Sequence, residues 1–296
     1  MDLEYLRTHP ETIPRLVEHQ RIRITPLGGA KGGRIERWTL DDGTDLFAKV
    51  IPDQKLTSEP GDGFVAEGRS LRWLAEAGAA AVPEVLIAIP EMLVTAWVDQ
   101  GRATTSGAEV FGRQLATLHA SGAPTFGAEA DGFLATLPLT NTPEPDWPTF
   151  YVKHRCLPFL RLARDAGALS AAQTSTIEAA LGRLPDAAGP PEPPARLHGD
   201  LWSGNVLPGR VDGADGWWLV DPAAYGGHRE TDLAMLALFG APHLDRVMDA
   251  YQEATPLAEG WRERVGLHQL HPLLVHCVLF GGSYASRAVA AARSVP

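Results

Sequence analysis

The spacing of apolar residues changes near residue 100 of this 296-residue chain, and this change constrains the fold more than any other feature. Before it, short segments rich in β-branched and aromatic residues are separated by turn residues, which is typical of antiparallel strands. After it, apolar residues recur at helical spacing in longer segments. We therefore expect an α+β fold of two lobes: an N-terminal antiparallel sheet with one key helix (residues 1–99) and a mostly helical C-terminal lobe (residues 100–296).

The same patterns predict the individual elements. A helix with Gly78 as its C-cap is predicted at residues 64–78. A short strand that ends at Asp221 is predicted in the otherwise helical second part. The other predicted strands are 21–27, 34–40, 45–51, 85–89 and 92–98, and the other predicted helices are 108–121, 147–167 and 170–184.

Charge and cysteine content exclude several classes of protein. The 26 basic and 36 acidic residues give a net charge of -10, which argues against binding to nucleic acid or to anionic membranes. No apolar run approaches the roughly 20 residues of a transmembrane helix, and the N-terminus lacks the pattern of a signal peptide. Cys156 and Cys277 lie far apart in apolar segments, which favours buried thiols over a disulfide. We expect a cytoplasmic monomer.

The most informative motif is HGDLWSGN, at residues 198–205, followed by the apolar segment WWLV and Asp221. Asp200, Asn205 five residues later, and a second aspartate at a strand end reproduce the spacing of a kinase catalytic loop and its metal-binding aspartate. Phosphoryl transfer needs a carboxylate that orients and deprotonates the attacking hydroxyl, and oxygen ligands for Mg²⁺. Asp200 suits the first role, and Asn205 and Asp221 suit the second. The alternative is a capped turn with solvated acids.

The first lobe supplies partners for this chemistry. Lys49 lies in the predicted strand 45–51, and Glu67 lies at the start of the predicted helix. An ion pair between a strand lysine and a helix glutamate is what positions the lysine on nucleotide phosphates in kinases. Between the first two strands is a glycine-rich turn whose backbone amides could approach phosphate oxygens, although such turns are also common for conformational reasons. Its glycines are Gly28, Gly29, Gly32 and Gly33.

HGDLWSGN, joined to the GHRE run at residues 227–230, resembles the fructosamine/ketosamine-3-kinase family, a branch of the aminoglycoside-phosphotransferase-like, protein-kinase-like fold. The resemblance covers nearly the whole chain. Further similar segments are residues 115–119, 126–127, 141, 146–155 and 280–284.

The resemblance implies ATP- and Mg²⁺-dependent phosphorylation of the 3-hydroxyl of ketosamines, the sugar adducts left on amines by glycation, on a small molecule or on a protein. It makes Asp200 the catalytic base, Asn205 and Asp221 the metal ligands, and Lys49 the phosphate contact held by Glu67. The nucleotide would lie beneath the glycine-rich turn, with adenine bonded to the backbone near Ala96 and Val98. Candidate substrate contacts are Trp202, Tyr225, His228 and Glu230.

Two other hypotheses stay open at this point. A kinase of the same fold could act on an aminoglycoside, choline or a free sugar, because the catalytic residues do not distinguish these acceptors. A pseudokinase would bind nucleotide without transferring phosphate, and the complete set of catalytic residues argues against it. Three further expectations follow. Asp232 holds the catalytic loop, and His198 supports it. Acidic side chains near the mouth of the substrate pocket favour cationic amines.

Overall fold

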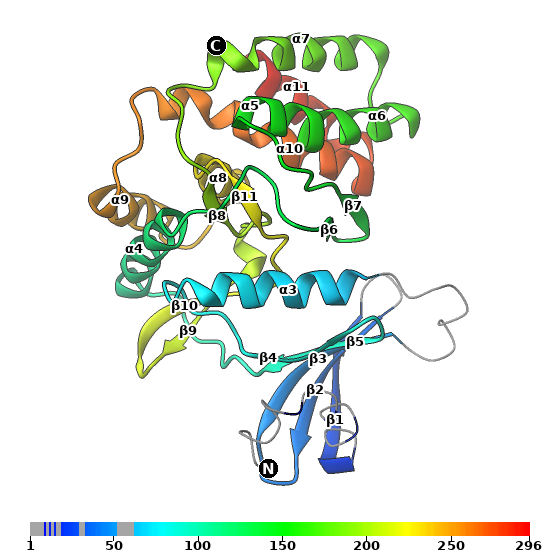
Figure 1. The fold of residues 1–296 in the computed structure, drawn as a ribbon, viewed down its shortest axis with the longest axis vertical. Coiled ribbons are helices and arrows are strands. Elements are labelled where there is room, and N and C mark those ends of the chain that lie inside the picture. Colours follow the sequence, from blue (N-terminus) through cyan, green and yellow to red (C-terminus); the bar gives the residue numbers. More distant parts are fainter. Residues whose placement is uncertain (1–8, 10–11, 13–14, 16–18, 30–32, 52–61) are drawn as a thin grey trace.

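The computed structural model describes residues 9, 12, 15, 19–29, 33–51 and 62–296. An antiparallel sheet forms one end of the molecule, and a group of helices forms the other (Figure 1). The predicted α+β architecture, with an N-terminal antiparallel sheet and a mostly helical remainder, is thereby confirmed.

The sheet has five strands in the order β1-β2-β3-β5-β4. Strand β3 is therefore central, and its alternation places Leu46 and Ala48 in the core while Phe47 and Lys49 face the opposite side. All five strands were predicted from the sequence, but β5 lies between β3 and β4, so the order is not a simple meander. Their bounds are Arg21–Gly28, Arg34–Leu40, Asp45–Val50, Val85–Ile89 and Met92–Ala96 for β1 to β5.

Helix α3 (Gly63–Glu76) crosses the sheet and separates it from the helical part (Figure 1). It buries Leu71 and Leu74, and it approaches β4 so closely at Gly68 that an added Cβ would overlap the Cβ of Ala88. Because Gly68 has no side chain, α3 can pack this close to the sheet. The distance between α3 and the sheet in turn sets the position of Glu67.

The remaining helices pack around two buried apolar clusters. The second cluster joins the helical part to α3 through Leu74 and includes the stacked pair Phe111 and Trp217. The helices are α4 (Thr105–Ala120), α5 (Trp147–Phe150), α6 (Leu157–Asp165), α7 (Ala171–Ala187), α8 (Glu230–Phe239), α9 (Leu244–Ala254), α10 (Trp261–Phe280) and α11 (Ala285–Arg293).

The segment predicted as one helix at 147–167 is divided by a π-helical turn at Tyr151–Cys156. Pro158 has no N–H to donate to the carbonyl of His154, so regular α-helical bonding cannot continue there. The Arg155 side chain donates to that carbonyl oxygen at 3.3 Å. Both cysteines are buried thiols, as predicted.

Six short strands in the second half of the fold form three two-stranded sheets, which place the loops of the site. The sequence predicted only β10 among them. The pairs are β6 (Gly132–Leu134) with β7 (Leu137–Leu139), β8 (Ala195–Leu197) with β11 (Tyr225–Gly227), and β9 (Val206–Val211) with β10 (Ala214–Leu219). The helices that the structure describes include none with the length and apolarity needed to span a lipid bilayer.

Candidate active site

A cavity of about 570 Å³ brings together seven of the residues singled out in the sequence, from both halves of the fold. Its wall on the sheet side comes from β3 and α3, and its floor comes from the loops after β8 and β10. The seven residues are Gly33, Lys49, Glu67, Asp200, Trp202, Asn205 and Asp221.

The loop after β8 is held from below by Asp232, which lies in the first turn of α8 and is buried. Its carboxylate accepts hydrogen bonds from the backbone N–H groups of His198, at 2.7 Å, and Gly199, at 3.0 Å. Gly199 has a φ of +82°, and an added Cβ would overlap the carbonyl oxygen of Ala223. The predicted role of Asp232 is confirmed, and Gly199 is the residue that lets the loop turn here.

His198 connects this loop to the end of the β10 segment. Its Nε2 donates to the carbonyl oxygen of Val220 at 2.9 Å, and its Nδ1 accepts from the backbone N–H of Asp200 at 3.3 Å. Both bonds require a neutral ring with the proton on Nε2. Burial lowers the pKa of His198, in agreement with this state. His198 thus supports the loop, as expected.

Asn205 orients the neighbouring carboxylate. Its Nδ2 donates to Oδ2 of Asp200 at 3.1 Å and to the Asp200 carbonyl oxygen at 2.9 Å, with a longer bond of 3.4 Å to the carbonyl oxygen of Asp221. The amide nitrogen is therefore committed to the loop. This orientation leaves Oδ1 of Asn205 as the atom that could bind a cation.

Lys49 bridges the two halves of the site. Its Nζ lies 2.7 Å from Oε1 of Glu67 and 2.7 Å from Oδ1 of Asp221. Burial lowers the pKa of Lys49, but the charges of the two carboxylates outweigh that effect and the net shift is upward. Burial raises the pKa of Glu67 to about 7, although the Lys49 charge opposes the increase. The ion pair predicted from the sequence is present.

Three side chains around the cavity floor offer oxygen atoms that suit Mg²⁺: Asp200, Asn205 and Asp221. The Asp221 side chain is 47% exposed, and its backbone has a φ of +53°, a conformation that non-glycine residues rarely adopt. Hard oxygen donors on a partly exposed floor beside a buried lysine are what a magnesium–nucleotide complex requires. The residues present therefore fit this cation.

A smaller cavity of about 230 Å³ adjoins the first, since Glu67 and Asp221 line both. It is lined by Phe47, Ala96 and Val98, and its wall is largely apolar. Of the glycines in the turn after β1, Gly33 lines the larger cavity, Gly28 and Gly29 line neither, and Gly32 lies outside the described residues.

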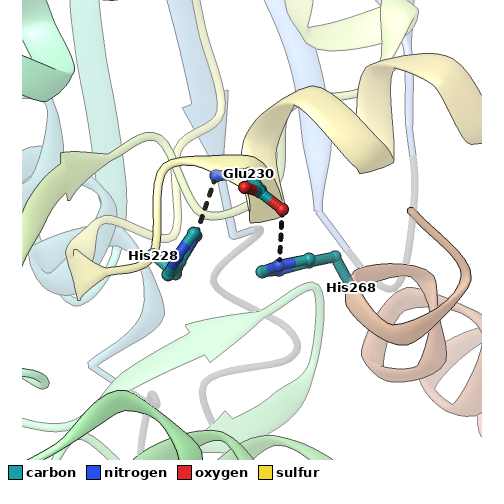
Figure 2. A group of neighbouring side chains, drawn as sticks. All are labelled: His228, Glu230 and His268. Carbon is teal, nitrogen blue, oxygen red and sulfur yellow. Dashed lines mark hydrogen bonds and ion pairs between the residues drawn. The ribbon is translucent and has the colours of Figure 1, made fainter. Parts of the chain in front are cut away.

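The other candidate substrate contacts do not face either cavity. Tyr225 is 1% exposed, with the Arg155 guanidinium stacked 3.9 Å from its ring centroid. His228 and Glu230 are each 4% exposed and lie against His268 of α10 (Figure 2). The structure thus separates Tyr225, His228 and Glu230 from Trp202, which does line the larger cavity.

The cluster of His228, Glu230 and His268 has the composition of a metal site, with ligand atoms within 4.8 Å of one another. However, Arg264 already donates to both carboxylate oxygens of Glu230, from Nη2 at 2.5 Å and from Nε at 3.0 Å. A cation would have to displace this guanidinium. Burial lowers the pKa of His228 to about 3, so its ring is neutral. We interpret the cluster as a buried network that fixes the start of α8.

Sequence reasoning missed some residues of the site. Ser70, one helical turn after Glu67, lines the larger cavity, and its Oγ accepts from the backbone N–H of Ala224 at 3.2 Å. This bond ties α3 to the segment after Asp221. His276 of α10 also lines the cavity, as does Phe280 in the family-like segment 280–284, for which no role was predicted. Ser70 lies three residues after Glu67, so helical spacing could have placed it on the same face of α3. The apolar sequence around His276 did not indicate that this residue lines a cavity.

The comparisons with known proteins agree with this geometry. A family model described as Fructosamine kinase matches residues 10–295. The "Probable ketoamine kinase YniA" of Escherichia coli K12 is 35% identical over 247 residues, which are 82% of each chain.

Solved structures extend the similarity to the fold. A crystal structure described as a "putative fructosamine-3-kinase", from Thermobifida fusca, has a TM-score of 0.89 at 47% identity and covers 97% of this chain and 98% of its own. The aminoglycoside phosphotransferase APH(4)-Ia, at 14% identity, has a TM-score of 0.62 over 96% of this chain and 98% of its own, which shows a shared fold.

Proposed function

This chain belongs to the fructosamine kinase family, and from that premise we propose that it uses ATP to phosphorylate the 3-hydroxyl of ketosamines. Enzymes of this family are phosphotransferases with an alcohol group as acceptor. The phosphorylated ketosamine is unstable and releases the amine, so the proposed role is repair of glycated amines.

The observation that carries this proposal is the meeting of Asp200, Asn205 and Asp221 with the Lys49–Glu67 ion pair around one cavity. These residues come from segments up to 172 positions apart. Their convergence around one cavity supports a common reaction. Unrelated solvated acids would not be expected to share hydrogen-bond and ion-pair partners in this way.

In the proposed reaction, Asp200 accepts the proton of the attacking sugar hydroxyl as that oxygen bonds to the γ-phosphorus of ATP and ADP departs. Asn205 holds the Asp200 carboxylate at 3.1 Å and so limits its rotation. Lys49, positioned by Glu67, binds nucleotide phosphates in place of part of its present contact with Asp221. Mg²⁺, when bound by Asn205 and Asp221, would neutralise charge on the phosphates.

The smaller cavity supports a site for the nucleotide base, next to the backbone of Ala96 and Val98. In this proposal residues 1–99 form the nucleotide-binding lobe and residues 100–296 the catalytic and substrate lobe. Gly33 would approach the phosphates, with Gly28, Gly29 and Gly32 in the same turn. A cytoplasmic location, a monomeric state and the lack of nucleic-acid partners stay predictions from the sequence.

The test is Mg²⁺-dependent ATP consumption by the purified protein with a panel of acceptors. The panel contains ribulose- and fructose-derived lysine adducts, an aminoglycoside, choline and free fructose, with buffer alone as the background. We expect turnover with the ketosamines only, and ³¹P and ¹H NMR of the product should place the phosphate on the 3-oxygen. Turnover confined to an aminoglycoside, choline or the free sugar would reject the ketosamine assignment. Bound ATP without turnover would favour a nucleotide-binding protein that lacks transfer activity.

A further inference from the structure

Four aromatic rings form a continuous surface at the mouth of the larger cavity. They are contributed by the C-terminal end of α8, the last turns of α10 and the short helix that follows α10, and we call this group the aromatic platform: Phe239, His276, Phe280 and Tyr284. The ring of His276 is central, with its centroid 4.7 Å from that of Phe239, 5.2 Å from Phe280 and 4.8 Å from Tyr284.

The platform is partly open to solvent, because Phe280 is exposed while the other three rings are half-buried. Phe280 is 60% exposed, the most of any large apolar side chain among the described residues, and both Phe280 and His276 line the cavity. Exposed aromatic rings beside a cavity are typical of ligand-binding surfaces, because their burial on binding recovers apolar surface from water.

Trp202 links the platform to the proposed catalytic base. Its ring packs edge-on against Phe239, with centroids 6.3 Å apart, and its backbone N–H donates to the carbonyl oxygen of Asp200 at 3.1 Å. The Trp202 side chain is 41% exposed and lines the same cavity. A substrate with its hydroxyl at Asp200 would therefore extend toward the platform.

The charges of the cavity do not select a cationic substrate. Among the described residues, its charged lining side chains are balanced, with Arg34, Lys49 and Arg69 against Glu67, Asp200 and Asp221. At the far edge of the platform is another cation, Arg287, whose guanidinium carbon lies 6.0 Å from the ring centroid of Phe239 and 5.9 Å from that of Tyr284. The lining thus has no excess of acidic side chains, and acidic surface charge around the mouth stays a prediction from the net charge.

We propose that the aromatic platform binds the amine-side substituent of the substrate and selects ketosamines whose substituent is apolar or aromatic. This inference rests on the proposed function. In a ketosamine the nitrogen is attached to C1, close to the C3 hydroxyl along the sugar chain. With that hydroxyl at Asp200, the substituent on nitrogen leaves the cavity on the side of Trp202 and lies over Phe280.

The test compares two ketosamines of the same sugar, one made from benzylamine and one from methylamine. The benzyl ring reaches the platform, whereas the methyl group does not. For Phe280→Ala we expect the KM of the benzyl substrate to rise about fivefold, the size expected for one lost aromatic contact, while the KM of the methyl substrate changes less than about twofold. Phe280→Tyr, which keeps the ring, should restore the low KM.

Leu162→Ala is the matched control, because Leu162 is 45% exposed on α6 and does not line the cavity. It should leave both substrates unaffected. Equal changes for the two substrates in Phe280→Ala, or no change for either, would overturn the proposed platform while the ketosamine activity stands. Failure of the unmodified enzyme to phosphorylate either ketosamine would reject the proposed function itself, and this inference with it.

Discussion

Asp200 accepts hydrogen bonds within its own loop at both its carbonyl oxygen and its carboxylate Oδ2. The carbonyl oxygen is fixed by the Nδ2 of Asn205 and the N–H of Trp202, while the carboxylate Oδ2 has the Asn205 contact at 3.1 Å. The Asn205 amide thus limits the rotation of the carboxylate that acts as the base in the proposed reaction.

Replacement of Asp200 by Asn tests this role. We expect kcat to fall by about 10²- to 10⁴-fold, the usual contribution of a general base, with the Kd for ATP within about twofold of the parent value. Steady-state kinetics and calorimetric titration with ATP measure the two quantities. Asp165→Asn is the control, since Asp165 is a largely exposed acid at the end of α6. A near-normal kcat in Asp200→Asn would exclude this residue as the base.

Among single residues, the sequence predicted Asp200, Asn205 and Lys49, because the spacing of each to its polar neighbours is typical of kinases. His228 and Glu230, in the GHRE run that the sequence suggested as substrate contacts, are buried and line neither cavity. Arg264, the partner of Glu230, is 34 residues further along the chain, on a helix whose pattern indicated only packing. An ion pair across that distance has no local signature.

Among the elements, α3 determines the position of Glu67, and its closest approach to the sheet is at Gly68. Gly68→Ala should force α3 away from β4 and weaken the Lys49–Glu67 contact. We expect a loss of about 1–3 kcal/mol in the free energy of unfolding, as for other overpacked sites, and a higher KM for ATP.

Gly182→Ala on α7 is the matched control for this prediction, because nothing lies within 4 Å of an added Cβ there. Alanine in a helix is favoured over glycine by roughly 0.5–1 kcal/mol, so this variant should be more stable than the parent with an unchanged KM. The stabilities measured by urea denaturation should therefore move in opposite directions for the two variants, and the KM for ATP should rise in Gly68→Ala only. Equal stabilisation by both would show that α3 has room to shift.

The start of α8 is the second element on which the site depends. In Asp232→Asn, one of the two backbone N–H groups would face an amide N–H in place of a carboxylate oxygen. We expect a loss of about 1–3 kcal/mol in unfolding free energy and a decrease in kcat of at least about tenfold, because the loop that carries Asp200 is released. Asp245→Asn, at the exposed start of α9, should change stability by less than about 1 kcal/mol and leave kcat unchanged. A normal kcat in Asp232→Asn would show that the loop holds its shape without this carboxylate.

The elements were predicted unevenly, and the reason is physical. Strands such as β2 and β3 bury one face, so alternation in the sequence reveals them. The three-residue strands β8 and β11 exist only because they pair with each other from positions 28 or more residues apart. Alternation over three residues is too short to indicate that pairing, and the insertion of β5 between β3 and β4 depends in the same way on tertiary contacts.

For the molecule as a whole, burial of several histidines makes stability depend on pH. Burial lowers the pKa of His228 and His271 to about 3 and also lowers the pKa of His198 and His268. In the unfolded chain these rings titrate near their ordinary value of about 6.5. Between about pH 6.5 and 3 the unfolded chain therefore binds more protons than the folded protein, and stability falls as the pH falls.

We expect His228 and His271, the two rings whose pKa falls to about 3, each to lower the free energy of unfolding by about 1 kcal/mol between about pH 7.5 and 5.5, with His198 and His268 acting in the same direction. Urea denaturation at the two pH values measures the loss. Two carboxylates bear on this window. Burial would raise the pKa of Glu230, but His268 and Arg264 outweigh it and lower that pKa to about 2, so Glu230 begins to lose its contribution only below its ordinary value of about 4.5. Glu67, whose pKa burial raises to about 7, takes up a proton in the folded protein within the window and so offsets part of the loss. His271→Gln removes one titrating ring, so its pH-dependent loss should be smaller than that of the parent by about 1 kcal/mol, whatever the substitution does to stability at pH 7.5. An equal pH-dependent loss in His271→Gln and in the parent protein would mean that His271 takes up a proton in the folded state, and its assignment as a buried neutral ring would then be wrong.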